Sequence, residues 1–188
     1  MKPERLNALT DGVVAIVLTI MVLELKFPEE PTLKAVMAIL PLLSAYLLAF
    51  IYVGLYWNNH HHMMQSAHRV TGGVMWANHA LLFCLTLFPL MIRWIGEAGV
   101  TPWPVASFGL VLAAAALAYR ILQWVLAAVE GEGSKIHEVV GHPTKEYSSL
   151  AIYIAAIALA FSKPYVSVAM YVLVALIWIV PDRRFSKA

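Results

Sequence analysis

The chain has 188 residues, of which 61% are hydrophobic and only 13% are charged. This composition excludes a disordered protein and is too apolar for an ordinary soluble domain. The formal net charge of +2 is too small to indicate a nucleic-acid partner, and none is expected. The single cysteine, Cys84, cannot form an intramolecular disulfide and is expected to pack inside an apolar segment.

Apolar segments of membrane-spanning length recur along the whole chain. Helices are the expected form, because lipid offers no hydrogen-bond partner to a free backbone group. The strands of a barrel would alternate in polarity, and these segments do not. The sequence therefore predicts an all-α, multi-pass membrane protein, with residues 1–188 forming one transmembrane domain in the lipid bilayer. The six predicted spans are at about 5–26, 33–58, 71–93, 103–129, 147–162 and 164–181.

The orientation follows from the Lys and Arg residues near the ends of the spans. With six spans both termini lie on one side, and that side holds nine of the 13 basic residues. These nine are Lys2, Arg5, Arg69, Arg120, Lys135, Lys145, Arg183, Arg184 and Lys187. The other four are Lys26, Lys34, Arg93 and Lys163. The excess predicts cytoplasmic termini, and the expected location is the plasma (inner) membrane.

The first predicted span carries charges at its foot. An Arg and an Asp at the end of a membrane helix are costly, so Arg5 and Asp11 need partners and indicate a function. Residues 24–28 do not form the small-residue site of a cleaved signal peptide, so the segment is expected to be retained. We interpret it as a helix that lines an ion pore.

One face of this helix forms an apolar stripe that contains a single hydroxyl group. At 100° per residue, the stripe consists of Gly12, Ile16, Thr19 and Leu23, with Ile20 on its flank. Arg5 falls near the stripe if the helix is continuous, and Asp11 points about 100° away. Symmetric copies of such a stripe can gate a pore by dewetting. The alternative is that these aliphatic side chains are ordinary packing, and the pattern alone does not decide between the two.

Two motifs make the pore interpretation specific. The segment Arg5-x-x-x-Leu9-Thr10-Asp11, followed by GVVAIVLTI at 12–20, resembles the Arg-x-x-x-Phe-Ser-Asp signature of the transmembrane protein 175 family. That family comprises endosomal and lysosomal potassium channels and their prokaryotic relatives. Leu9 stands for Phe and Thr10 for Ser, and both changes keep the chemical type.

The second motif is Trp57-x-x-His60-His61, followed by Trp76-x-Asn78, which is also similar to that family. The resemblance implies a homotetramer of six-helix subunits in which the first helix of each subunit lines the pore. Channels of this family lack a Thr-Val-Gly-Tyr-Gly filter, and that motif is absent from this sequence.

The resemblance also implies roles for the residues of the stripe. The apolar constriction falls on Ile16, with further layers at Ile20 and Leu23, and the pore-facing hydroxyl falls on Thr19. The resemblance further implies that monovalent cations pass through the pore, with K⁺ as the expected permeant ion, and no cofactor is expected. The spacing i, i+3, i+4 and i+7 allows one helix face to present all four side chains.

The charged and polar residues at the pore end form a second predicted group, which we call the polar foot. Its members are Arg5, Thr10, Asp11, His60, His61 and Asn78. A carboxylate inside a bundle must be paired, and Arg5, a His ring or Asn78 could each donate to Asp11. The expected role of the polar foot is structural, because it would hold three helices together.

Other functions have weaker support. Consecutive residues His60, His61 and His62 point in three directions on a helix, and no spaced ligand set completes a metal site. Arg120 is expected to snorkel toward the cytoplasmic interface. No catalytic motif is found, so an enzyme is not expected. The sequence predicts a potassium-permeable channel without a P-loop filter. A proton-coupled secondary transporter or a non-conducting scaffold remains the alternative.

Overall fold

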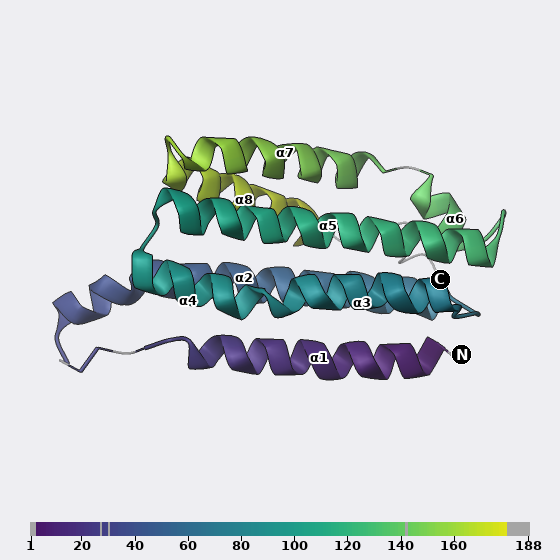
Figure 1. Cartoon of the computed structure of the whole chain (residues 1–188), viewed down its shortest axis with the longest axis horizontal. Coiled ribbons are helices and arrows are strands. Elements are labelled where there is room, and N and C mark those ends of the chain that lie inside the picture. Colours follow the sequence, from purple (N-terminus) through teal and green to yellow (C-terminus); the bar gives the residue numbers. More distant parts are fainter. Residues whose placement is uncertain (1–2, 27, 30, 142, 180–188) are drawn as a thin grey trace.

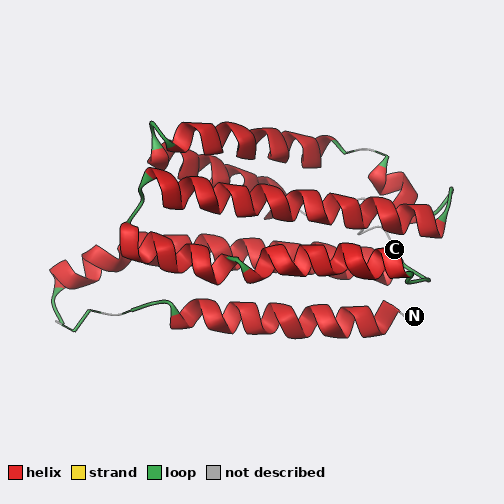
Figure 2. Ribbon diagram, in the orientation of Figure 1, coloured by secondary structure: helices red, strands yellow, loops and turns green. Residues whose placement is uncertain are grey.

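The structure, a computed structural model, describes residues 3–26, 28–29, 31–141 and 143–179. These residues form eight helices and contain no strand (Figure 2). The helices are α1 (Pro3–Leu23), α2 (Leu33–Gln65), α3 (Gly72–Thr86), α4 (Phe88–Ala98), α5 (Pro102–Glu130), α6 (Lys135–Val140), α7 (Thr144–Ala160) and α8 (Pro164–Ile179). The predicted all-α fold is confirmed.

The long helices lie side by side in layers (Figure 1). Helix α5 is central and packs against α3 and α4 on one side and α7 and α8 on the other. Helix α1 lies at one edge of the bundle, where it packs mainly against α2, α3 and α4. One flank of α1 therefore has no neighbour among the residues that the structure describes.

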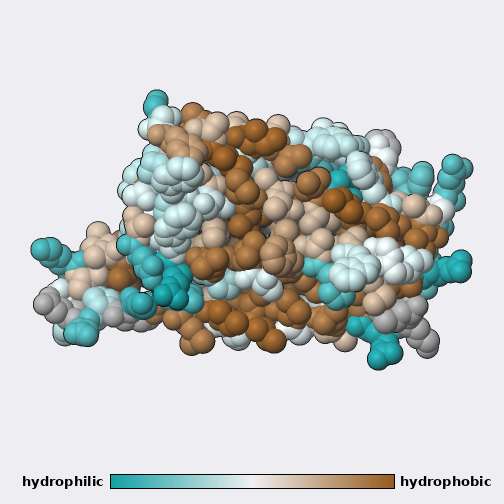
Figure 3. All heavy atoms as spheres, viewed as in Figure 1, coloured by the Kyte–Doolittle hydropathy of each residue, from teal (hydrophilic) through white to brown (hydrophobic). Residues whose placement is uncertain are grey.

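The surface has the polarity of a membrane protein. On the face shown in Figure 3, apolar residues predominate along the middle of the molecule, and the most hydrophilic residues gather toward its two ends. Four segments are long and apolar enough to cross a bilayer, namely Pro3–Leu23, Leu33–Gln65, Gly72–Ala98 and Pro102–Glu130. Helix α8 is a shorter apolar helix. The chain is a multi-pass membrane protein.

Three helix boundaries differ from the prediction. Helix α2 continues to Gln65, because Met63 and Met64 at its end are buried apolar residues that extend its packed face. The third predicted span is interrupted between α3 and α4, where Pro89 has no N–H to continue the helical ladder. The loop at 130–146 contains the short helix α6, and α7 begins at Thr144 rather than near 147.

A few predicted features lie outside the described residues. They are the end of the last span at 180–181 and the basic residues Lys2, Arg183, Arg184 and Lys187.

Three tyrosines hold four helices together in the core. The Tyr153 hydroxyl donates to the Tyr52 hydroxyl at 3.2 Å, and Tyr52 donates to the carbonyl oxygen of Tyr171 at 2.6 Å. The Tyr171 hydroxyl in turn donates to the carbonyl oxygen of Val105 at 3.2 Å. Each of these buried hydroxyls thus has a partner, as the apolar interior requires. The bonds join α2, α5, α7 and α8.

Replacing Gly109 with Ala should destabilise this core by about 1–3 kcal/mol, the usual cost of overpacking. A Cβ atom at Gly109 would overlap the Tyr171 hydroxyl and lie 2.8 Å from Cγ1 of Ile157. Thermal unfolding of the detergent-solubilised protein measures the loss. Gly54→Ala is the matched control, because a Cβ there meets nothing within 4 Å. Equal melting temperatures for the two variants would contradict this account.

Candidate functional site

Helix α1 packs through one narrow face. Its buried residues recur every three or four positions and are Leu6, Thr10, Val14, Val17 and Met21. This spacing places them on the side that contacts α2, α3 and α4. The predicted stripe therefore lies on a different face of the helix.

The stripe is exposed in the single chain. Ile16 is 58% exposed, Ile20 is 41% exposed and Leu23 is 77% exposed. Thr19 and Gly12 are exposed as well. Large aliphatic side chains on a membrane protein can face lipid, a second subunit or a narrow pore, and their exposure alone does not distinguish these surroundings.

The Thr19 hydroxyl is the one polar group of the stripe, and it is tied to its own helix. Its Oγ1 atom lies 3.0 Å from the Ala15 carbonyl oxygen and 2.9 Å from that of Ile16, and it donates toward both. Because the proton points back to the backbone, the oxygen lone pairs face outward. An outward hydroxyl oxygen can accept a hydrogen bond from hydrated ions or contact a cation directly.

A groove runs beside the stripe. It has a volume of about 420 Å³ between α1 and the α3–α4 segment, and its walls include Ile16, Ile20, Thr86 and Leu90. Glu24 and Arg93 lie at its polar end. Two residues of the stripe therefore border an open space along the bundle instead of filling a packed core.

Three members of the polar foot meet in the interior. The side-chain amide of Asn78 donates to Thr10 Oγ1 at 3.1 Å, and Asn78 Oδ1 lies 2.8 Å from His60 Nε2. All three residues are at most 2% exposed. Since Asn78 Oδ1 is an acceptor, His60 Nε2 carries a proton. This buried triad of Thr10, His60 and Asn78 joins α1, α2 and α3.

Asp11 has a partner that the sequence analysis did not consider. Trp57 Nε1 donates to Asp11 Oδ1 at 2.7 Å. The Trp57 ring stacks on His61, with centroids 5.7 Å apart and an interplanar angle of 22°. His61 Nε2 lies 2.9 Å from the side-chain nitrogen of Gln65. The donor to Asp11 is therefore an indole, and Arg5, the His rings and Asn78 do not fill that role.

The polar foot is thus two connected groups. The buried triad lies inside the bundle, and the Asp11–Trp57 pair lies on its exposed side. Arg5 is exposed at the start of α1. A signal for the Asp11 partner was present in the sequence, since Trp57 precedes His60 by almost one helical turn. That spacing places the two side chains on adjoining faces of α2.

Two other polar contacts at this end were not foreseen. Glu130, the last residue of α5, accepts from the backbone N–H groups of His68 and Arg69 at 2.7 and 3.0 Å. Arg120 does not snorkel but is only 6% exposed, and it donates to Gln123 Oε1 at 3.3 Å and to the Val140 carbonyl at 2.8 Å. Helix α6 supplies that carbonyl and so keeps Arg120 inside the protein.

The fold, its long apolar segments and the polar junction of α1, α2 and α3 define a polytopic, all-helical membrane protein. Comparison with known proteins gives its family. Residues 5–89 match the family described as the endosomal/lysosomal potassium channel TMEM175. The matched segment contains the whole stripe and the whole polar foot.

The relatives agree with that family. A protein of Chryseobacterium sp. (strain P1-3), named as a potassium channel, is 48% identical over 184 residues, which cover 98% of this chain and 96% of the relative. A potassium channel of Chamaesiphon minutus is 31% identical over 179 residues and 87% of each chain. This chain belongs to the TMEM175 family of potassium channels, and it is not an enzyme.

A solved structure supports the fold separately. The crystal structure of a lysosomal potassium-selective channel TMEM175 homolog from Chamaesiphon minutus superposes with a TM-score of 0.82. The alignment covers 97% of both chains at 22% sequence identity. The helical arrangement is therefore shared over nearly the whole chain.

Proposed function

We propose that this chain is one subunit of a homotetrameric, potassium-permeable cation channel. The observation that carries the proposal is the exposed stripe on α1, in a member of a potassium-channel family. In a tetramer, four such stripes would surround one axis. The apolar constriction would consist of Ile16, Ile20 and Leu23, and Thr19 would contribute a ring of hydroxyl oxygens.

The proposed subunit crosses the plasma membrane six times, with both termini in the cytoplasm. The spans are α1, α2, the α3–α4 segment, α5, α7 and α8. Successive spans run in opposite directions in Figure 1, as expected if each of them crosses the membrane once. Most of the Lys and Arg residues lie on the side of the polar foot, and this excess supports the placement of that side in the cytoplasm.

The proposed mechanism needs no P-loop filter and no cofactor. A ring of aliphatic side chains can close a pore by excluding water, and it conducts when the ring widens enough to stay wet. The Thr19 hydroxyl oxygen would then replace part of the water that a permeating K⁺ loses from its hydration shell. The polar foot is assigned a structural role, because its bonds join the three helices that position the stripe.

Flux into liposomes tests this function. Purified protein reconstituted with a K⁺ gradient should pass K⁺ without an imposed proton gradient. The measurement pairs a potassium-selective electrode with a pH-sensitive dye inside the vesicles. Flux that depends strictly on counter-moving or co-moving protons would instead identify a proton-coupled transporter. No flux at all, from protein that is folded and inserted, would leave a non-conducting scaffold.

Replacing Asp11 with Ala should reduce the assembled tetramer and its K⁺ flux together. The change removes the acceptor of the 2.7 Å bond from Trp57, so α1 loses its anchor on the exposed side of α2. A hydrogen bond to a charged group contributes about 1.5–3 kcal/mol. Size-exclusion chromatography with light scattering reports the oligomer, and the liposome assay reports the flux.

Trp57→Phe is the companion variant. It keeps an aromatic ring over His61 but removes the indole donor, so it should reproduce the direction of the Asp11→Ala effect. Glu29→Ala, a change of an exposed carboxylate in the α1–α2 loop, serves as the control. Normal assembly and flux in both Asp11→Ala and Trp57→Phe would refute the structural role of this pair.

A further inference from the structure

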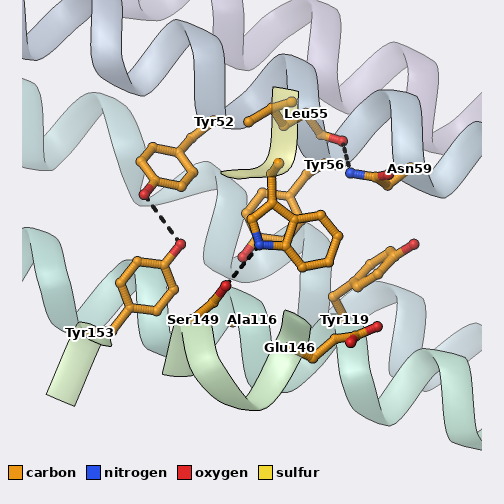
Figure 4. Close-up of a pocket in the computed structure, with 10 residues that line it drawn as sticks. Tyr52, Leu55, Tyr56, Asn59, Ala116, Tyr119, Glu146, Ser149 and Tyr153 are labelled. Atoms are coloured by element: carbon orange, nitrogen blue, oxygen red, sulfur yellow. Dashed lines mark hydrogen bonds between the residues drawn. The ribbon is translucent and has the colours of Figure 1, made fainter. Parts of the chain in front are cut away.

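A second space lies beside α2, on a face of the helix that adjoins the one carrying His60. It is bounded by α2, α5, α7 and α8, and Figure 4 shows its lining. Asn59 reaches it from α2, one residue before His60, so the pocket lies at the same end of the bundle as the polar foot. Its free volume is about 40 Å³. That volume holds about three water molecules or one organic group of similar size.

Half of the pocket wall is aromatic. The aromatic residues are Tyr52, Tyr56, Tyr119, Tyr153 and Trp178. The rings of Tyr56 and Tyr119 meet edge to face, with centroids 6.0 Å apart and planes at 68°. Such an arrangement turns the negative face of one ring away from its neighbour, where a cation can be attracted to it.

The polar groups of the pocket are rich in acceptors. Oε2 of Glu146 is enclosed and, within the described part of the chain, has no hydrogen-bond partner. Ser149 Oγ donates to the Lys145 carbonyl oxygen at 2.8 Å and accepts from Trp178 Nε1 at 2.9 Å. Asn59 directs its amide nitrogen to the Leu55 carbonyl at 2.9 Å, away from Glu146 (Figure 4). The Glu146 carboxylate is therefore the group in this pocket that lacks a hydrogen-bond donor among the described residues.

Two basic side chains in this part of the bundle make contacts with other groups. Lys145 places Nζ 4.9 Å from the centroid of the Trp178 ring. Arg120 donates to Gln123 and the Val140 carbonyl, and its guanidinium lies 5.8 Å from the Tyr147 ring. Both examples show that aromatic rings in this region already accept cations. Burial of a carboxylate oxygen without a hydrogen-bond donor is energetically unfavourable. A cation with N–H groups would supply the missing donor and an opposite charge.

We propose that this pocket binds a small organic ammonium ion. The ammonium group donates to Glu146 Oε2, and its short apolar body lies against the Tyr56 and Tyr119 rings. Because Asn59 and His60 are neighbours on α2, an occupied pocket would stiffen the helix that also holds the buried triad. The site is separate from the stripe on α1, and the proposal does not depend on conduction.

Ethylammonium is the probe, because its three non-hydrogen atoms match the available volume. Ethanol is the neutral control, since it has the same chain and a hydroxyl in place of the ammonium group. The full-length protein in detergent carries 5-fluorotryptophan at its six Trp positions. Trp178→Phe assigns the fluorine resonance of Trp178, which lines the pocket. We expect the chemical shift of that resonance to change saturably with ethylammonium concentration and to remain unchanged with ethanol.

Variants of the pocket locate the binding. Glu146→Gln keeps the size of the side chain but removes its charge, and it should weaken ethylammonium binding by about tenfold or more. Glu132→Gln, a change of an exposed carboxylate in the turn after α5, should leave the affinity unchanged. Tyr119→Leu should weaken binding, whereas Tyr119→Phe keeps the aromatic face and should preserve most of it.

Several outcomes would overturn the proposal. These are the absence of a saturable Trp178 response, an equal response to ethanol, or an unchanged affinity in Glu146→Gln. Binding that survives Glu146→Gln but disappears in Ile16→Asn would place the cation beside α1 and would also overturn it. If Glu146→Gln fails to fold, the Tyr119→Phe and Tyr119→Leu pair decides, since equal affinities in those two variants would exclude an aromatic contact.

Discussion

Replacing Ile16 with Asn should increase the K⁺ flux through reconstituted protein. Ile16 is 58% exposed on α1, and we propose that it forms the narrowest part of the constriction. A carboxamide keeps water in a short pore segment from which an aliphatic ring expels it. If wetting lowers the barrier to permeation by about 1.4 kcal/mol, the rate rises about tenfold. In a homotetramer the change occurs four times around the axis.

The same variant should also change ion preference. An aliphatic constriction makes an ion lose water before it passes, and the cost of that loss differs between K⁺ and Na⁺. A wetted ring lets both ions keep more of their hydration shells, so the difference between them should shrink. Bilayer recordings under a K⁺/Na⁺ bi-ionic gradient measure the reversal potential, which should move toward zero.

Val22→Asn is the matched control for Ile16→Asn. Val22 is 46% exposed on α1, so it accepts the same change without disturbing a packed core. It lies about 240° around the helix from Ile16, on a different face. Its flux and reversal potential should remain those of the unmodified protein. Unchanged currents in Ile16→Asn, or equal changes in both variants, would remove Ile16 from the pore.

The sequence predicted the features that depend on local pattern. Helical spacing placed Ile16 and Leu23 on one face of α1, and the structure exposes both. The side that packs was not predicted correctly, because Asp11 was expected inside the bundle, whereas it is exposed and the buried line runs through Thr10, Val14 and Val17. The predicted starts of α5 and α8 were close to the observed ones, because proline in the first turn followed by a long apolar run marks the start of a helix. These signals act within a few residues and need no knowledge of partners.

The sequence was a poorer guide to which side chains contact one another across different helices. Asp11 and Trp57 are 46 positions apart, and their contact depends on how α1 rotates against α2. Arg5, two His rings and Asn78 were equally able to donate by chemical type. Burial of Arg120 depended on α6, a helix of six residues whose sequence carries no strong helical period. Tertiary packing decided each of these cases.

The end of α2 shows how packing overrides composition. Residues 58–62 are Asn and His, and this polarity placed the end of the predicted span at about residue 58. The helix continues because His60 is bonded inside the bundle and Met63 and Met64 are buried beyond it. A polar residue that is satisfied by a specific partner does not end a helix. The same bond therefore explains both the length of α2 and the position of the buried triad.

Replacing Asn78 with Leu should destabilise the protein by about 2–4 kcal/mol, because two buried polar groups lose their partner at once. His60 Nε2 loses its acceptor at 2.8 Å, and Thr10 Oγ1 loses the donor at 3.1 Å. Leu has the same branched arrangement of side-chain heavy atoms as Asn and is larger, so the loss comes from unpaired polar groups and tighter packing rather than from a cavity. Thermal unfolding in detergent measures it.

Variants of Thr10 and His60 distinguish the contribution of the hydrogen bonds in the buried triad from that of packing. Thr10→Ser keeps the hydroxyl and should preserve stability, whereas Thr10→Val removes it and should cost less than Asn78→Leu. In the triple variant Thr10→Val, His60→Leu, Asn78→Leu no polar group is left unpaired. Replacing all members of a buried hydrogen-bonded group by apolar residues of similar shape is often nearly neutral. The triple variant should therefore regain much of the stability that Asn78→Leu loses.

Conduction provides the last comparison. If the buried triad only joins α1, α2 and α3, the triple variant should recover K⁺ flux together with stability, since apolar packing can also hold three helices. A triple variant that is stable and tetrameric but does not conduct would show that the polarity of the triad contributes to permeation or gating. Losses that simply add across the three single variants would show that these residues act independently, contrary to the bonds that connect them.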